Sequence, residues 1–181
     1  MKLACLGWGS LVWDPRGLPV VGPWFEDGPF MPVEFTRKSN DGRITLVCDD
    51  QAAPLRVLWA QMRVPDLHAA RLALRDRESI NAQQWEHLVP AWISGEDDPK
   101  GFMGISAWAH SVGLEGVVWT GLGHKFNDNT GRPTVGEIIS YLDGLRGPVR
   151  VKAEQYVRRT PTQIDTEYRR EMEARLGWTP C

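Results

Sequence analysis

The sequence predicts an α+β fold, a small mixed β-barrel of about six strands with flanking helices. Three strand-like segments, 31–37, 43–49 and 55–63, follow one another and predict an antiparallel meander, which argues against a doubly wound parallel sheet. The turn between the first two segments, Ser-Asn-Asp-Gly at 39–42, has the composition of a hairpin connection. Strands and helices elsewhere do not alternate strictly, which also favours a mixed sheet.

The other strands are predicted from apolar runs and alternation. They are expected at 2–7, 115–122 and 149–157. The stretch 14–29 contains several Pro and Gly residues and is expected to be an irregular connection. Trp85 to Trp92 have helical spacing, but Pro90 should break or kink a helix there.

Helices are predicted where apolar residues recur at three and four positions. They are expected from 65–66 to about 75–78, around 102–112, from Thr134 to about 145, and from about Thr162 to Gly177. Thr134 and Glu137 have the spacing of a capping box, and Gly177 is a typical C-terminal stop. The remaining loop, 123–133, is defined by its polar and glycine-rich composition.

The bulk composition is that of an ordinary globular chain. It has 181 residues, 42% hydrophobic and 24% charged, which fits a single domain spanning 1–181. The net charge is -2 without a basic block, which argues against a nucleic-acid partner. No apolar run has membrane-spanning length and no targeting segment is visible, so a soluble cytoplasmic protein without a membrane partner is expected. The oligomeric state stays open.

Neither the cysteines nor the histidines form a metal pattern. Cys5, Cys48 and Cys181 are odd in number and far apart, so they predict neither a zinc site nor a disulfide framework. The four histidines are scattered, with no pair four residues apart. No metal and no other cofactor is therefore expected. Most of the nine Trp are expected in the core, and a few at a pocket wall.

The first candidate site is the turn after the first strand. Gly7 and Gly9 flank Trp8, and such glycines are costly unless φ is positive or something approaches the backbone closely. Val12 stands where a dinucleotide fingerprint needs its third glycine, and Ser10 lacks the flanking glycines of a nucleophile elbow. What remains is a nest of successive amides at Gly9, Ser10 and Leu11, suited to a carboxylate or an oxyanion. A tight strand exit without a ligand explains the spacing equally well.

The second candidate is the carboxylate of Glu78, at the end of a helix with an apolar face. A negative charge is disfavoured at a helix C-terminus, which raises a carboxyl pKa toward the range of a general base. By sequence alone, a solvated helix end is the simpler interpretation. Arg77 either points toward the site or pairs with Asp76.

The order of these two features resembles a known family. LGWGSLVWDP (6–15) resembles the N-terminal signature of the γ-glutamylcyclotransferase superfamily, closest to its ChaC-type branch. RKSNDGRITLV (37–47), VLWAQMRVPDLHAARLALRDRE (57–78) and TVGEIISYLDGLRG (134–147) resemble later blocks of that branch, in the same order. Trp8 stands where the family has Tyr, and SINAQQW (79–85) replaces a Gly-Tyr, so Trp85 is the nearest aromatic there.

The resemblance implies a mixed β-barrel and a cofactor-independent enzyme that cyclises a γ-glutamyl group to 5-oxoproline. It places the catalytic general acid and base on Glu78. The substrate-binding candidates that follow from it are Gly7, Trp8, Gly9, Ser10, Leu11, Arg37 and Trp85. Two other hypotheses stay open: a related amidase or acyltransferase that keeps Glu78 but makes no 5-oxoproline, and a non-catalytic module that binds a small ligand or a partner.

Overall fold

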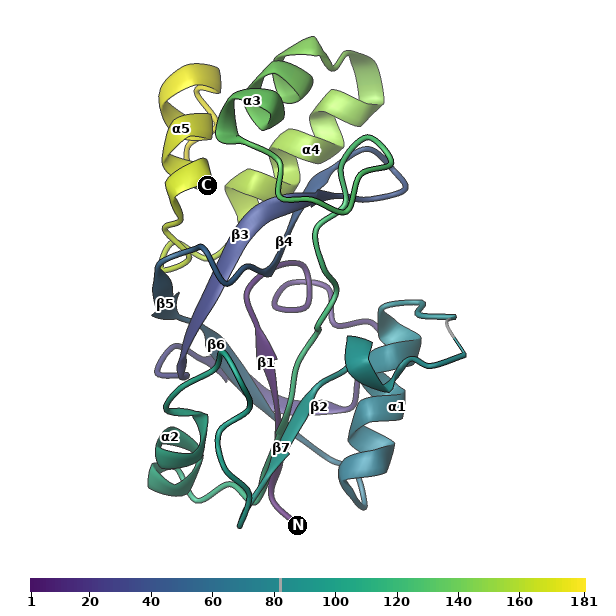
Figure 1. Cartoon of the computed structure of the whole chain (residues 1–181), viewed down its shortest axis with the longest axis vertical. Helices are drawn as coiled ribbons and strands as arrows, with labels where there is room; N and C mark the ends of the chain where they lie inside the picture. The colour runs from purple at the N-terminus through teal and green to yellow at the C-terminus, as the bar shows by residue number, and fades with distance from the viewer. Residues whose placement is uncertain (82) are drawn as a thin grey trace. The chain divides into compact units, whose positions relative to one another are not determined.

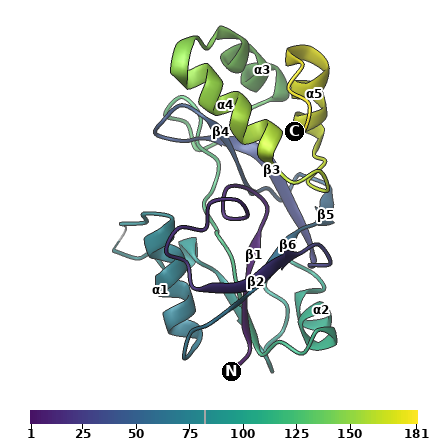
Figure 2. The same cartoon turned by 180° about the vertical axis from the view of Figure 1, so that it is seen from behind.

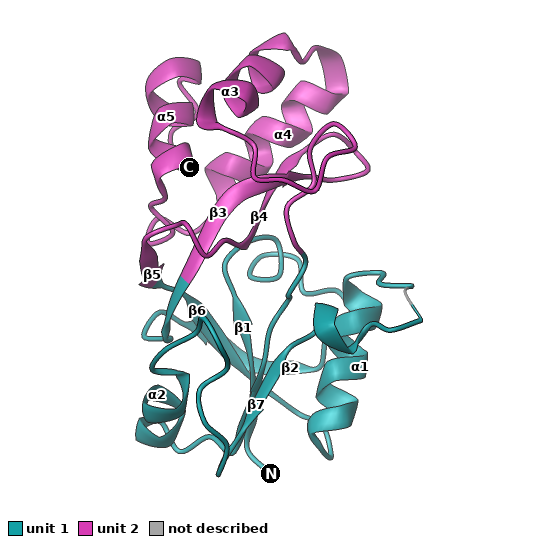
Figure 3. Cartoon of the chain, in the orientation of Figure 1, with its two compact units in different colours: residues 1–31, 56–122 teal, residues 32–55, 123–181 magenta. Residues whose placement is uncertain are grey.

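The computed structural model describes residues 1–81 and 83–181, which divide into two compact units (Figure 3). The first unit comprises 1–31 and 56–122, and the second comprises 32–55 and 123–181. The strands are β1 (Leu3–Gly7), β2 (Val20–Phe25), β3 (Phe30–Lys38), β4 (Ile44–Cys48), β5 (Pro54–Arg56), β6 (Leu58–Met62), β7 (Ala91–Ile93) and β8 (Gly116–Val118). The helices are α1 (Leu67–Arg77), the short 3-10 helix η1 (Glu86–Leu88), α2 (Ile105–Ser111), α3 (Val135–Gly144), α4 (Gly147–Arg159) and α5 (Glu167–Leu176).

The first unit is built on a mixed sheet with the strand order β2-β6-β1-β8-β7. Its central strand β1 runs antiparallel to β6 and parallel to β8. Figures 1 and 2 show α1 and α2 on opposite sides of this sheet. Because β1 is paired on both sides, the position at which the following turn begins is fixed.

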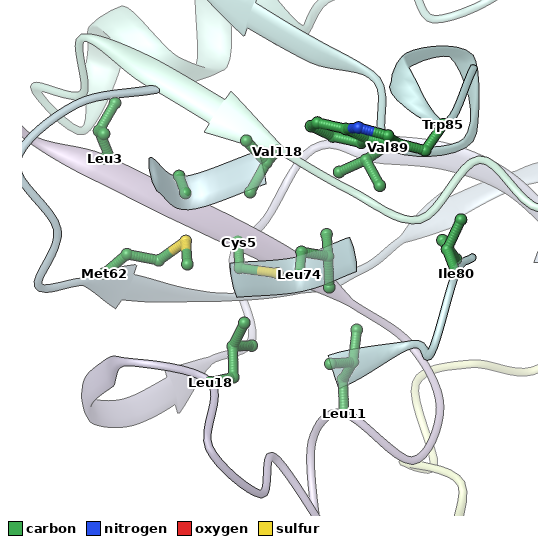
Figure 4. Packing of buried hydrophobic residues seen from close by; sticks show 11 residues of the cluster. Leu3, Cys5, Leu11, Leu18, Met62, Leu74, Ile80, Trp85, Val89 and Val118 are labelled. Carbon is green, nitrogen blue, oxygen red and sulfur yellow. The ribbon is translucent and has the colours of Figure 1, made fainter. Parts of the chain in front are cut away.

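The core of the first unit lies between the sheet and α1. Figure 4 shows its apolar side chains, with Cys5 of β1 beside Leu74 of α1. Leu11 from the turn and Trp85 from the segment after α1 belong to the same cluster of buried residues. Burial of such side chains is the main source of stability in a unit of this size. The core therefore fixes the turn and the end of α1 against the same sheet.

The second unit combines a smaller sheet, ordered β4-β3-β5, with α3, α4 and α5 (Figure 1). β3 and β4 form the antiparallel hairpin that the Ser-Asn-Asp-Gly turn predicted. Tyr156 of α4 packs edge-to-face on Phe35 of β3, and its hydroxyl accepts a hydrogen bond from the Leu46 amide of β4. These contacts anchor α4 to both strands of the hairpin.

The α+β class is confirmed, but the barrel is wrong: the described residues form two open sheets. The expected meander breaks because 55–63 is not one strand. Val57 separates β5 from β6, and its amide donates to the Pro29 carbonyl outside either sheet. β6 then pairs with β1 and β2 instead of continuing the hairpin.

The segment 149–157 is a helix, not the predicted strand. Val149 and Val151, whose alternation suggested a strand, are exposed at 38% and 52%. Ala153, Tyr156 and Val157 form the buried face, with the three- and four-residue spacing of a helix. The apolar residues at the start of α4 therefore lie on its solvent side, and their spacing does not indicate the buried face of the helix.

Three other expectations also need correction. The connection 14–29 contains the edge strand β2, whose register shifts where Gly22 has a φ of 77°. Of the helical spacing at 85–92 only the short η1 remains, and β7 follows it directly after Pro90. α5 begins later than expected, because Thr166 caps it through a hydrogen bond from the Arg169 amide. The capping box of Thr134 and Glu137 is confirmed.

Candidate functional site

The turn after β1 is a single turn of helix-like backbone. The Val12 amide donates to the Gly9 carbonyl at 3.0 Å, and the Asp14 amide donates to the Ser10 carbonyl at 2.8 Å. As at any helix start, the first amides are left over. Among residues 1–81 and 83–181, no acceptor is found for the amides of Gly9, Ser10 and Leu11. These three consecutive donors lie where the sequence predicted them.

The conformation of this turn differs from the expected nest. A nest alternates right- and left-handed residues, whereas neither Gly7 nor Gly9 has a positive φ. Gly7 is required for the second reason given above, close approach. A Cβ on Gly7 would lie 2.6 Å from the ring of Trp24, so a larger residue would force that ring to move. Packing against Trp24 within the first unit therefore explains why position 7 is a glycine.

Glu78 lies at the C-terminal end of α1, where it is the capping residue. The helix begins at Asp66, whose side chain accepts a hydrogen bond from the Ala69 amide, and its apolar face packs on the sheet. The Glu78 side chain is 17% exposed, so it is neither sealed in the core nor free in bulk water. Ser79, directly after it, has a left-handed φ of 54°, which turns the chain sharply away from the helix.

Arg77 joins Glu78 to the turn. One guanidinium nitrogen, Nη1, lies 3.1 Å from Oε1 of Glu78. The other, Nη2, donates to Oγ of Ser10 at 3.2 Å and to the carbonyl of Asp14 at 2.7 Å. The Arg77 side chain is only 4% exposed, so its geometry is fixed by packing. The two segments that the sequence singled out are thus connected through one guanidinium group.

This arrangement answers the question of which residue Arg77 pairs with. Asp76 pairs with Arg75 instead, at 2.6 Å, on the exposed side of the helix end. The sequence alone left the position of the Arg77 side chain unassigned. A signal existed, because Ala70, Leu74 and Arg77 share one buried face at helical spacing. An arginine in line with an apolar stripe is expected to point inward.

The thiol of Cys5 lies in the electrostatic field of this pair. Burial raises the pKa of Cys5 strongly, the negative charge of Glu78 raises it further, and Arg77 lowers it in part. Cys5 is fully buried in the core cluster beneath the helix end. Such a thiol is inert at neutral pH, so it is not a nucleophile for this site.

Two further predicted binding residues, Trp85 and Arg37, have contacts of their own in the structure. Trp85 is 8% exposed and belongs to the core cluster, where its ring is covered by the guanidinium groups of Arg71 and Arg75. Arg37 belongs to the second unit, where Nη1 donates to the Gly123 carbonyl at 2.8 Å.

A hollow of about 470 Å³ opens at the C-terminal end of α1, and Glu78 is not among its lining residues. It is lined by Arg75, Asp76, Ser79, Ile80 and Asn81. In the part of the chain that the structure describes, no three His, Cys, Asp or Glu residues are grouped as a metal ion would require. No described helix is both long and apolar enough to cross a membrane.

No family model matches the chain, and neither does any curated protein. Among solved structures, the chain is similar to a γ-glutamyl cyclotransferase specific to glutathione from yeast, with a TM-score of 0.45 and 14% identity over 98% of each chain. The likeness concerns the course of the chain, and at this identity it does not indicate which residues react.

Proposed function

We propose that this protein is a γ-glutamylcyclotransferase-like enzyme, which converts a γ-glutamyl compound into 5-oxoproline and a free amine. The observation that carries the proposal is the position of Arg77, which binds both Glu78 and the turn at Ser10 and Asp14. A carboxylate and a row of amide donors held by one buried side chain form a compact set of groups for acyl transfer.

In this proposal Glu78 acts first as base and then as acid. It takes a proton from the α-ammonium group of the substrate, and the resulting amine attacks the γ-carbonyl carbon of the same molecule. A C–N bond forms, the carbonyl oxygen gains negative charge, and the bond to the leaving amine then breaks. Glu78 returns its proton to that leaving nitrogen, and the ring nitrogen gives its second hydrogen as a proton to the released amine, so no proton is gained or lost overall.

The amides of Gly9, Ser10 and Leu11 are the proposed partners for negative charge on the substrate. They hold the α-carboxylate or stabilise the developing oxyanion, as preorganised N–H donors do. Because the reaction is intramolecular, much of the rate comes from binding the substrate in a folded conformer. A turn fixed by β1 and by Arg77 suits this role, since its donors do not need to reorganise.

The surroundings of Glu78 suit a carboxylate that changes its charge during turnover. The C-terminal end of α1 disfavours a negative charge, while Arg77 favours it at 3.1 Å. The ion pair with Arg77 is made through Oε1. We assign the proton transfer to the carboxylate of Glu78.

A second candidate is a non-catalytic module that binds a small anionic ligand. It is favoured by the same ion pair, because a guanidinium bound to Glu78 makes the carboxylate a weaker base. This candidate predicts that the chain binds a γ-glutamyl compound and releases no product. An amidase or acyltransferase on the same fold predicts release of the amine without 5-oxoproline.

The test is a 5-oxoproline release assay with glutathione, γ-glutamyl amino acids and γ-glutamyl-lysine. We expect product from at least one compound, and a loss of about a hundredfold or more in Glu78→Gln, because general acid–base catalysis contributes about 10²–10⁴. The matched control is Asp76→Asn, a carboxylate at the same helix end that is paired with Arg75 and 67% exposed. It should keep nearly full activity.

Each outcome separates the candidates. Amine release without 5-oxoproline supports the amidase or acyltransferase. Binding of the compounds by calorimetry, without product and without a change in Glu78→Gln, supports the non-catalytic module. Equal losses in Glu78→Gln and Asp76→Asn would overturn the assignment of the base to Glu78.

A further inference from the structure

The second unit contains a hollow of its own, separate in sequence from the turn and Glu78. It has a volume of about 360 Å³ and is lined by residues of the β3–β4 turn and of the loop after Gly123, namely Lys38, Ser39, Asn40, Lys125, Asn127 and Asp128. The proposed reaction uses none of these residues. The proposed reaction therefore does not account for this hollow.

Two lysines from distant parts of the chain meet in this hollow because their backbones are paired. The Lys38 amide donates to the Lys125 carbonyl, and the Lys125 amide donates to the Thr36 carbonyl. Arg37 strengthens the junction through its hydrogen bond to the Gly123 carbonyl. Both lysines therefore line the hollow from a fixed junction between β3 and the loop.

Neither ammonium group is neutralised by an ion pair with a carboxylate of the described residues. Lys38 lies over the ring of Tyr141, with Nζ 4.4 Å from the ring centroid. That contact stabilises a cation but leaves its charge uncompensated. Tyr141 is itself held by a hydrogen bond from its hydroxyl to the Gly42 carbonyl. The ring therefore keeps Lys38 at the hollow.

The opposite wall is a tight turn with left-handed backbone. Asn127 and Asp128 have φ values of 47° and 61°, and Phe126 and Asn129 exchange two backbone hydrogen bonds around them. This geometry matches a type I′ hairpin turn, in which Asn and Asp are among the preferred residues. The turn presents one amide side chain and one carboxylate to the hollow.

We propose that this hollow binds a small oxyanion, the phosphate or carboxylate group of a ligand. Its ionisable lining carries two positive charges and one negative charge, a net charge of +1. Ammonium groups bind such oxyanions through charge-assisted hydrogen bonds, and Asn40 and Asn127 supply amide donors. Asp128 weakens the attraction, so it limits the affinity rather than providing it.

The experiment is an NMR titration of the full chain that follows the amides of residues 39–40 and 127–128. The probes are sodium phosphate and sodium acetate, each compared with sodium chloride at equal ionic strength. We expect saturable shifts at these amides with at least one oxyanion. Saturation by phosphate alone identifies a phosphate group as the ligand chemistry, and saturation by acetate identifies a carboxylate.

Three variants give the proposal a charge signature. Lys125→Gln should weaken binding about tenfold, because one charged hydrogen-bond partner is lost. Asp128→Asn should tighten binding several-fold, and Asn tolerates left-handed backbone as well as Asp does. Lys152→Gln, an exposed lysine on α4 of the same unit, is the matched control and should not change the affinity. Shifts no larger than those with chloride, or equal affinities in all three variants, would overturn the proposal.

Discussion

Two of the arginine–carboxylate pairs, one from each unit, are built in opposite ways. In the first unit, Arg77 is 4% exposed and its partner Glu78 is 17% exposed. In the second unit, Arg132 is 22% exposed while its partner Asp49 is completely buried, with Nε of Arg132 2.6 Å from Oδ2. The more buried side chain is the cation Arg77 in the first pair and the anion Asp49 in the second.

The difference separates a carboxylate that a substrate can reach from one that holds the structure together. Asp49 also accepts a hydrogen bond from the Gln51 amide, and Arg132 donates to the hydroxyl of Tyr168 on α5. Both carboxylate oxygens of Asp49 therefore accept hydrogen bonds from within the protein. Glu78 contacts the buried guanidinium of Arg77 and is itself partly exposed to solvent. The same chemical pair thus serves structure in one unit and, we propose, catalysis in the other.

The largest effect on stability is expected from Arg132→Met. It leaves the buried carboxylate of Asp49 without its guanidinium, and breaking a buried ion pair costs about 3–5 kcal/mol. Urea unfolding should show this loss. The double variant Asp49→Asn/Arg132→Met should recover part of it, because neither member of the pair is then charged. A loss below about 1 kcal/mol in Arg132→Met would mean that Asp49 does not depend on this partner.

A smaller loss of stability is expected from Arg77→Met, about 1–3 kcal/mol. The substitution leaves Ser10 and the Asp14 carbonyl without their donor, but Glu78 still reaches water. The rate of 5-oxoproline release should fall by more than the loss of folded protein explains, because the turn and the carboxylate lose their common contact with Arg77. Arg77→Lys keeps the charge without the fork and should fall between wild type and Arg77→Met in kcat. If Arg77→Met unfolds more easily than Arg132→Met, the contrast between the two pairs fails.

The smallest effect concerns Glu34, a second buried carboxyl of the second unit, 1% exposed. Burial raises the pKa of Glu34, although hydrogen bonds from the Thr166 hydroxyl and the amides of Phe35 and Tyr168 lower it in part. Its stabilising contribution is therefore complete below the unfolded pKa near 4.5 and is lost as the pH rises through the higher folded pKa.

Glu34→Gln removes this titration while keeping an acceptor for the same donors. The stability of the wild type relative to the variant should fall as the pH rises above about 4.5, with a slope of at most about 1.4 kcal/mol per pH unit. Unfolding curves between pH 4 and 7 measure it. Asp50→Asn, an exposed neighbour in the same unit, should keep the wild-type pH dependence. A constant difference between wild type and Glu34→Gln contradicts this account.

Much of the first unit could be predicted because its signals are local. The apolar run of β1, the Asp66 cap and the stripe of Ala70 and Leu74 each lie within one element, and the structure bears them out. The amides of Gly9 to Leu11 were expected from spacing alone. The role of Gly7 was not, because it depends on Trp24, which a different strand brings over the glycine.

The second unit shows where sequence reasoning fails. Val149 and Val151 indicated a strand, since exposed apolar residues at the start of α4 imitate alternation. Asp49 and Arg132 are 83 residues apart, so nothing in the sequence connects them. Lys38 and Lys125 likewise meet only because β3 pairs with a distant loop. Long-range pairing carries no local pattern and is not visible in a single sequence.

The sequence by itself determined the α+β class, most of the elements and the two motifs at Gly7–Leu11 and Glu78, because periodicity and capping act over a few residues. Only the tertiary structure decided that the strands form two open sheets and that Arg77 faces Glu78 and the turn. The physical reason is the range of the interactions: strand pairing and buried ion pairs depend on which distant segments the core brings together. A helix cap depends on its neighbours alone.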